Sequence, residues 1–368
     1  MLRRSITPLE RSPEVPDWWE PLFAEATHAS IFMSPEWIRT WLEIYGRDFS
    51  GLWIYWNDKN RVVGGCLILT RVTRKYVFSL TTTYFNCTGD ASERTPLAEF
   101  NDVLFIEPYS KEITNDLAKF LTTQEWDRLS ISGYEPGGVL HALCNSLPSS
   151  GLQHESQTAA YVDLDLLKDI TFEKSLSANT RSQIKRSFRH YHELTGSITV
   201  QRAANTQEAL AYLDQLAIFH NKRRATKDEL GAFESRSIVN FHVTLIPKLF
   251  VKKHVDLLKI TSGVTTIGYL YNFVRNGKVY FFQSGFNYEN DPKMKPGLLT
   301  HALAIQFYVE NGMSEYDFLA GDAQYKRSLA KQTRALSWSV LYRDNFRVRS
   351  MLVVKRLSDW VLNRNSNT

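Results

Sequence analysis

The sequence has few cysteines and no long apolar segment. Cys66, Cys87 and Cys144 are the only cysteines in 368 residues. An odd number without zinc-site spacing argues against a disulfide framework and a metal centre, so we expect a reducing, cytoplasmic location. No run approaches the ~18 apolar residues of a membrane span. The opening MLRRSITPLERSPEVP has no apolar stretch behind its arginines, so we expect no signal peptide.

Strong charge of one sign is also missing. The formal net charge is +5, which permits an anionic ligand without demanding nucleic acid. No zinc pattern or recognition signature indicates a DNA-binding module. Hydrophobic residues make up 43% and charged residues 23%, which is typical of a soluble globular protein. The length predicts two domains.

The first half begins with a clear helix signal. Ser34 is placed as the N-cap, Pro35 as the first helical residue and Gly46 as the stop. The remaining pattern predicts two strands within 51–72, strands at 102–107, 125–134 and 161–166, and helices at 110–123 and 136–147.

The second half repeats this order of elements. The pattern predicts helices at 177–196, 206–225, 296–312 and 323–331, and strands at 197–204, within 255–286, at 314–321 and at 335–344. An Asn-Gly pair joins two of the three strands within 255–286. The recurrence predicts an α/β fold with mixed α+β sheets, built from two copies of one unit. We assign residues 1–160 to a first domain, 161–345 to a second and 346–368 to a helical tail.

Several motifs of the second half carry a resemblance to a known family. They are Ser177-Ala-Asn-Thr-Arg181, Phe219-His220-Asn-Lys-Arg223, Gln283-Ser-Gly-Phe286, Pro296-Gly-Leu-Leu299 and Phe318-Leu-Ala-Gly-Asp-Ala-Gln-Tyr325-Lys326. In this order they resemble the bacterial BioF2-like and CelD/BcsL-like branch of the GNAT acyltransferases. With the SPEWIRTW opening, the resemblance spans roughly residues 30–342.

The resemblance implies two tandem GNAT-like domains, related to the Fem-type peptidyltransferases. It places the acyl-CoA site in the second domain and makes the first a degenerate copy. It also suggests a role in polysaccharide biosynthesis. In the family's phosphate loop, Gly297 matches the first glycine, whereas Met294 and Leu299 depart from the pattern.

The loop before residue 296 is the expected phosphate site. Successive backbone N–H groups at a helix start attract a pyrophosphate, and glycine allows close approach. The candidate cofactor-binding residues are Lys293, Lys295, Gly297, Leu298 and Leu299. The alternative is an ordinary turn with solvated lysines and a helix-starting proline.

Acyl transfer to an amine needs a base for the amine and an acid for the leaving thiolate. The resemblance places Tyr325 as that acid. Asp317, in an apolar strand, and His220, at a helix end, are the other catalytic candidates. The alternatives are a half-buried core tyrosine, an ion-paired aspartate and a histidine that complements the helix dipole.

Four further residues are candidates for substrate binding. Arg223 lies three residues after His220 and so shares its helix face. Gln283 and Lys326 belong to the quoted motifs, and Asp322 follows Gly321. For Asp322, the competing interpretation is an N-cap of the helix at 323–331.

The helix at 177–196 carries a basic stripe. Arg181, Lys185 and Arg189 follow one another at i, i+4 and i+8, and Ile184, Phe188 and Tyr191 form the expected apolar side. The stripe is either a solvated face or a site for an anionic partner.

The first hypothesis is an acyl-CoA-dependent N-acyltransferase, with acetyl-CoA or another acyl-CoA as co-substrate and no metal. Its acceptor would be an amine of a small molecule, a sugar or a glycan, which can be anionic. The second is a Fem-type aminoacyl-tRNA-dependent transferase, and only this one involves tRNA. The third is a non-catalytic binding protein on the same fold. The sequence leaves the oligomeric state open.

Overall fold

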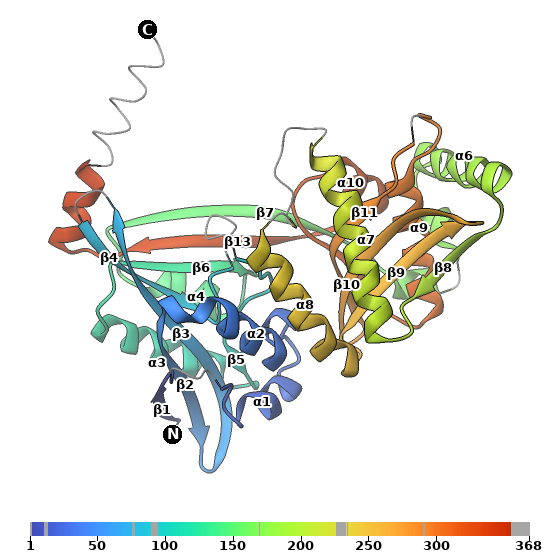
Figure 1. Ribbon diagram of the computed structural model, residues 1–368. Helices are drawn as coiled ribbons and strands as arrows, with labels where there is room; N and C mark the ends of the chain where they lie inside the picture. Colours follow the sequence, from blue (N-terminus) through green and yellow to red (C-terminus); the bar gives the residue numbers. More distant parts are fainter. Residues whose placement is uncertain are drawn as a thin grey trace, which may run out of the picture. The chain divides into compact units, whose positions relative to one another are not determined.

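The computed structural model describes residues 2–10, 14–75, 78–89, 95–168, 170–225, 233, 235–289 and 291–354. The chain forms two compact units (Figure 1). Unit 1 comprises residues 1–156 and 336–368, and unit 2 comprises residues 157–335. The predicted first domain ended at residue 160. Residues 336–345, assigned from sequence to the second domain, are grouped with unit 1. Residues 346–354 are helical, and the rest of the predicted tail lies outside the described residues.

Unit 1 is built on a sheet with the strand order β1-β2-β3-β4-β6-β13, and β5 pairs with β3. Its strands are β1 (Arg3–Pro8), β2 (Ser50–Asp58), β3 (Arg61–Lys75), β4 (Phe78–Phe85), β5 (Leu104–Phe105), β6 (Arg128–Tyr134) and the end of β13 (Gln332–Tyr342). The predicted strand at 102–107 is reduced to the two residues of β5. Neither β1 nor β4 was predicted.

The described part of unit 1 contains both α-helices and short 3-10 helices. They are α1 (Trp19–Glu25), η1 (Ile31–Met33), α2 (Pro35–Tyr45), η2 (Gly46–Asp48), α3 (Ser110–Thr123) and α4 (Val139–Ser146). Ser34 Oγ accepts the backbone N–H of Trp37, Pro35 is in the first turn and Gly46 is the C-cap. The predicted start and stop of α2 are therefore confirmed.

Unit 2 has the strand order β7-β12-β11-β10-β9-β8. The strands are β7 (Gly151–Asp163), β8 (Ile198–Arg202), β9 (Val255–Ser262), β10 (Thr265–Arg275), β11 (Lys278–Phe286) and β12 (Glu315–Ala320). The helices are η4 (Asp165–Leu167), α5 (Phe172–Ser175), α6 (Ala178–Thr195), α7 (Thr206–Ala225), α8 (Arg236–Val251), α9 (Pro296–Glu310) and α10 (Gln324–Leu329). The prediction of mixed α/β units is confirmed.

Helices cover both faces of the unit 2 sheet (Figure 1). On one face, Leu270 and Val279 join a buried core with residues of α6 and α9. On the other face, the Tyr269 ring lies 5.3 Å from Tyr212 of α7. The Tyr271 hydroxyl lies 3.2 Å from Nδ1 of His242 on α8. Strand alternation sends these neighbours of β10 to opposite sides, so unit 2 has three layers.

The chain crosses between the units inside two strands. β7 begins in unit 1 and enters unit 2 at residue 157, where it pairs antiparallel with β12. β13 returns to unit 1 at residue 336, and its residues Ser337–Tyr342 pair antiparallel with β6. In sequence, β7 of unit 2 therefore comes directly after the elements of unit 1, and the β13 residues of unit 1 come directly after the elements of unit 2.

Candidate active site

A parallel strand pair opens in unit 2. β11 and β12 pair at three positions only, Lys278 with Glu315, Val279 with Tyr316 and Tyr280 with Asp317. Beyond this point β11 continues beside β10, and β12 continues beside β7. The β7–β12 register shifts after Asp317, and Leu319 has a φ of +59°. The two strands thus diverge at their carboxyl ends and form a wedge.

Aromatic side chains surround the point of divergence. Phe281 and Phe318 are the first residues after the last paired position. The ring of His301, on α9, lies 4.5 Å from Phe281 and 5.3 Å from Phe318. Tyr325, on α10, stacks on His301 with ring centroids 5.1 Å apart and planes at 10°. The wedge therefore begins at a packed aromatic cluster that includes one imidazole and one phenol.

Tyr325 is half-buried, and burial raises the pKa of its phenol, with a further contribution from nearby Tyr288. The phenol therefore keeps its proton at neutral pH. A protonated phenol beside the wedge can act as a general acid.

The loop after β11 leads directly into α9. Lys295 is the N-cap residue, and its own side chain makes no capping hydrogen bond. The backbone N–H of Lys295 donates to Ser187 Oγ of α6 (3.0 Å). Asp291 Oδ1 accepts the N–H of Lys293, and Oδ2 lies 2.6 Å from His190 of α6. Two hydrogen bonds thus fix this loop against α6.

The predicted phosphate-site residues fall into two groups. Lys293 is exposed, Lys295 is half-buried, and neither forms an ion pair within the part of the chain that the structure describes. Leu299 is fully buried, and its N–H donates to Lys295 O inside the helix, so it offers no donor to a ligand. Leu298 packs partly against the core. A Cβ on Gly297 would lie 3.1 Å from the Phe286 ring, so this glycine also serves packing.

A cavity of about 450 Å³ lies between the end of α7 and the loop after β11. It is lined by Phe219, Lys222, Arg223, Phe286, Asn287, Tyr288 and Glu289. The Arg223 guanidinium lies 4.4 Å from the centroid of the Tyr288 ring. Aromatic faces with two cations and the carboxylate of Glu289 suit a ligand that has an apolar surface and both a negative charge and an amine.

His220 lies near this cavity on the inner side of α7. It is buried, and its Nδ1 lies 3.2 Å from the carbonyl oxygen of Ser284 on β11. A carbonyl can only accept, so Nδ1 carries the proton and Nε2 is the basic nitrogen. His220 and Tyr325 contact opposite faces of the sheet. The wedge between β11 and β12 lies in the sheet itself.

Asp317 has a structural environment. It is fully buried, its Oδ1 accepts the N–H of Leu319 (2.6 Å), and its Oδ2 lies 3.6 Å from Arg334 Nε. Arg334 also pairs with Glu315 (2.6 Å) and lies 3.9 Å above the Tyr161 ring. This geometry favours the ion-paired alternative over a catalytic role.

Three of the substrate-binding candidates form hydrogen bonds or ion pairs within unit 2. Asp322 is exposed and pairs with Arg327, and α10 has no side-chain cap, so the capping interpretation of Asp322 is wrong. Lys326 is buried and donates to the carbonyls of Leu319 (3.0 Å) and Ala320 (2.7 Å). It therefore stabilises the end of β12. Gln283 is half-buried and its Oε1 accepts the N–H of Ser284.

The basic stripe of α6 points away from the loop contact. Ser187, which meets Lys295, is fully buried, and Arg189 and Lys185 lie two positions to either side, on the exposed face. Lys185 pairs with Glu173 (3.6 Å). Phe188, predicted on the apolar side, is 39% exposed, because Ser187 takes that place against α9.

Sequence reasoning missed His301. It lies in the apolar stretch Leu298–Ile305, where a histidine is more often a core residue, and no motif marks it. Its spacing of four residues from Gly297 was the available signal, because it places both on one face of α9.

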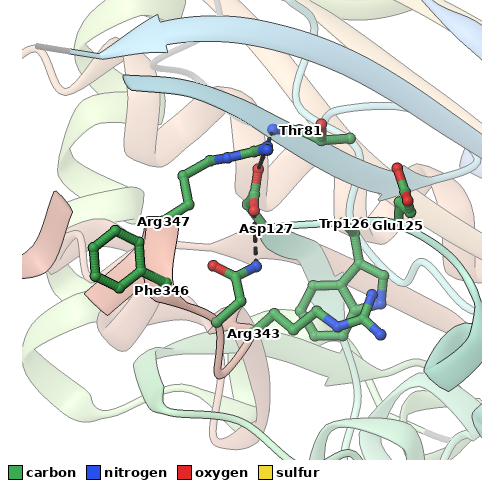
Figure 2. A pocket seen from close by; sticks show the side chains of 8 residues that line it. Thr81, Glu125, Trp126, Asp127, Arg343, Phe346 and Arg347 are labelled. Atoms are coloured by element: carbon green, nitrogen blue, oxygen red, sulfur yellow. Dashed lines mark hydrogen bonds and ion pairs between the residues drawn. The ribbon is translucent and has the colours of Figure 1, made fainter. Parts of the chain in front are cut away.

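A second cavity, of about 550 Å³, lies in unit 1 at the end of β13. Figure 2 shows Arg347 reaching Asp127, whose carboxylate also accepts from Thr81 N–H and from Asn345. Arg343 donates to the carbonyls of Thr122 and Gln124. These pairs hold the segment after β13 against unit 1, and the cavity contains none of the predicted site residues.

Two further findings concern the described residues. Within them, no group of three or more His, Cys, Asp or Glu side chains could hold a metal ion. No helix in the same part of the chain is long and apolar enough to cross a bilayer.

Residues 178–327 match the model of the acetyltransferase (GNAT) domain family. Unit 2 is a GNAT-fold domain. The matched residues run from the start of α6 to α10, so they include the wedge, the loop and both stacked rings. A search of curated protein sequences gives no match.

Solved structures extend the similarity of fold beyond unit 2. FemX is 12% identical with a TM-score of 0.56, over 87% of this chain and 94% of that one. A protein of unknown function from Bacteroides thetaiotaomicron is 8% identical with a TM-score of 0.53, over 88% and 96%. L-PGS from Bacillus licheniformis is 13% identical with a TM-score of 0.50, over 88% and 96%. At these identities the similarity concerns the fold alone.

Proposed function

We propose that unit 2 transfers an acyl group from acyl-CoA to an amine, with acetyl-CoA as the expected donor. The observation that carries this proposal is the wedge between β11 and β12 beside the start of α9, where the N-cap side chain makes no capping bond. A wedge of this kind accepts an extended thioester arm, and the helix start attracts its pyrophosphate. Lys293, Lys295 and the N–H groups of Gly297 and Leu298 would hold the phosphates.

In this proposal, the base and the acid come from opposite faces of the unit 2 sheet. The amine nitrogen attacks the thioester carbon, the C–S bond breaks, and the thiolate leaves with the bonding electrons. The amine gives up a proton, which we assign to His220 Nε2, and the thiolate takes a proton from the phenol of Tyr325. Asp317 and Lys326 support β12 and its ion pairs in this scheme.

The acceptor would occupy the cavity between α7 and the loop. Lys222 and Arg223 favour an acceptor with a carboxylate or phosphate, and the aromatic faces favour a sugar or another ring. A small amine, an amino sugar or a glycan-linked amine fits these requirements, which is consistent with a role in polysaccharide biosynthesis.

A specific observation favours a second candidate. The fold follows FemX over 87% of this chain, and Arg181 and Arg189 present positive charge on α6. A Fem-type transferase that takes its acyl group from aminoacyl-tRNA would use such a surface for phosphates.

The test is calorimetric titration of the purified protein with acetyl-CoA, free CoA and a longer acyl-CoA. Saturable binding near one site per chain supports the proposal, and the tightest ligand identifies the acyl group. If none of the three binds, the acyl-CoA proposal is rejected. Binding of charged tRNA that weakens in Arg181→Ala/Arg189→Ala would then support the second candidate. Failure of both leaves a non-catalytic binding protein.

A further inference from the structure

His301, in the aromatic cluster beside the wedge, has a ring nitrogen that no described residue meets. The side chain is fully buried. Its Nδ1 lies 3.2 Å from the Tyr316 hydroxyl, and among the residues described by the structure no partner lies within reach of Nε2. A buried polar group without a partner costs about 1–3 kcal/mol, so such a group needs an explanation.

The position of His301 suggests a ligand as the missing partner. Its ring touches Phe281 and Phe318, the first residues after β11 and β12 stop pairing. Tyr325 covers its other side. The orphaned nitrogen therefore belongs to a ring at the apex of the wedge, next to the phenol that would protonate the leaving group.

The contact with Tyr316 indicates which nitrogen carries the proton. If the Tyr316 hydroxyl donates to Nδ1, its proton is satisfied and Nε2 bears the ring hydrogen. The opposite assignment would leave both the hydroxyl proton and Nε2 without partners. Burial, with the charge of Lys326 as the second cause, lowers the pKa of His301 to about 3. The ring is thus neutral, with Nε2–H as a donor.

We propose that Nε2–H of His301 donates a hydrogen bond to the carbonyl oxygen of the thioester in bound acyl-CoA, which rests on the function proposed above. The carbonyl oxygen gains negative charge when the amine attacks, so a fixed donor stabilises the transition state more than the ground state. His301 would be a catalytic residue, and Tyr316 would set its tautomer.

A second histidine of unit 2 provides a matched control. His242 on α8 is also buried, its Nδ1 also lies 3.2 Å from a tyrosine hydroxyl, and burial also lowers its pKa to about 3. It packs on the opposite face of the sheet, against Tyr271 and Phe282. Replacing His242 removes the same chemical group away from the wedge.

The experiment uses acetyl-CoA labelled with carbon-13 at the carbonyl, bound to the full chain and observed by isotope-edited infrared spectroscopy. The carbonyl stretch should lie at lower frequency in the wild type and His242→Phe than in His301→Phe. His301→Gln, which keeps a donor near the position of Nε2, should recover part of the shift. Removing one such donor should lower turnover with an amine about 100-fold. Titrations should give free-CoA affinities within about twofold of one another for all variants.

The outcomes separate this inference from the proposed function. No binding of acetyl-CoA to the wild type rejects the proposed function itself. Binding with the same carbonyl frequency in wild type and His301→Phe rejects the role of His301 alone, and a water molecule would then satisfy Nε2. Equal loss of free-CoA and acetyl-CoA binding in folded His301→Gln also overturns it, because the contact would not involve the acyl carbonyl.

Discussion

Both units contain a parallel strand pair that separates after three positions, but the space beyond is used differently. In unit 1, β4 and β6 pair from Thr82–Arg128 to Tyr84–Ser130. Beyond this pair, residues that follow β4 in the sequence lie against the end of β6. Ser132 Oγ donates to the carbonyl of Thr88, and Asn101 N–H donates to the carbonyl of Gly133. In unit 2, the corresponding space borders aromatic rings and an imidazole nitrogen without a described partner.

The hydrogen bonds of polar groups beyond the two parallel strand pairs also differ between the units. In unit 1, Asn86 donates to Asn101 Oδ1 and to the carbonyl of Asp102, and accepts from Leu67 N–H. Asp102 in turn accepts the first N–H groups of α4. The Asp102 carboxylate at the start of α4 disfavours an anion there, whereas no side chain among the described residues is bonded to the N–H groups of Gly297 and Leu298 at the start of α9. Unit 1 therefore closes the space beyond its strand pair with its own residues, whereas the corresponding space in unit 2 is the candidate site.

The largest effect should come from Tyr325→Phe. Loss of a general acid should lower kcat by about 10²- to 10⁴-fold, with acyl-CoA affinity nearly unchanged. Steady-state kinetics and calorimetric titration would show this. The control is Tyr134→Phe in unit 1, whose hydroxyl meets Ser339 at 2.6 Å. Equal kinetic loss in both variants would contradict the assignment.

Asn86→Ala should mainly affect stability. It removes three hydrogen bonds, and Asn86 has a φ of +61°, which alanine disfavours. We expect the free energy of unfolding to fall by about 2–4 kcal/mol, with acyl-CoA binding retained. Urea unfolding measures this. Asn86→Gly keeps the backbone freedom and separates the two causes. Lost ligand binding in folded Asn86→Ala would show that unit 1 takes part in the site.

Two of the buried histidines of unit 2, His242 and His301, predict a pH response. Burial lowers the pKa of His242 and of His301 to about 3. The unfolded chain binds protons below pH ~6.5 and the folded chain does not, so stability present above that pH is lost as the pH falls. Each histidine should contribute about 1.4 kcal/mol per pH unit in this range.

Urea unfolding between pH 5 and 7.5 tests this response, and His242→Phe should show a shallower slope. The ionisable neighbours are Tyr271 for His242, and Tyr316, Tyr325 and Lys326 for His301. Burial raises the pKa of all three tyrosines, so they do not titrate in this range. An unchanged slope in His242→Phe would mean that His242 is already protonated in the folded chain.

The smallest effect should come from Lys293→Ala. An exposed cation near the start of α9 should contribute about 0.3–1 kcal/mol, or about two- to fivefold in acyl-CoA affinity, and less at high salt. Lys119→Ala, an exposed position on α3 of unit 1, makes the same change in charge. Titrations at two salt concentrations compare the variants. If both weaken binding equally, the effect is general charge and not the loop.

Local signals predicted most elements, and tertiary geometry decided the rest. Ser34, Pro35 and Gly46 predicted α2, since capping depends on neighbours in sequence. The sequence did not reveal β4, because three consecutive threonines interrupt the apolar alternation of FSLTTTYF. In the site, Tyr325 stacks on His301 beside the wedge, and its role as the acid stays a prediction. The ion pair of Asp317 with Arg334 and the bonds of Lys326 join segments whose approach no local pattern encodes.

The crossing of the chain within β7 and β13 has a consequence for synthesis on the ribosome. When residue 335 has been translated, the sheet of unit 1 still ends at β6, because its antiparallel partner is residues 337–342. An open strand edge is available to other chains. Unit 2 already has β7 beside β12 at that stage. Unit 2 would therefore be complete before unit 1, although most of unit 1 is made first, and a nascent chain stopped at residue 335 would expose β6 to aggregation.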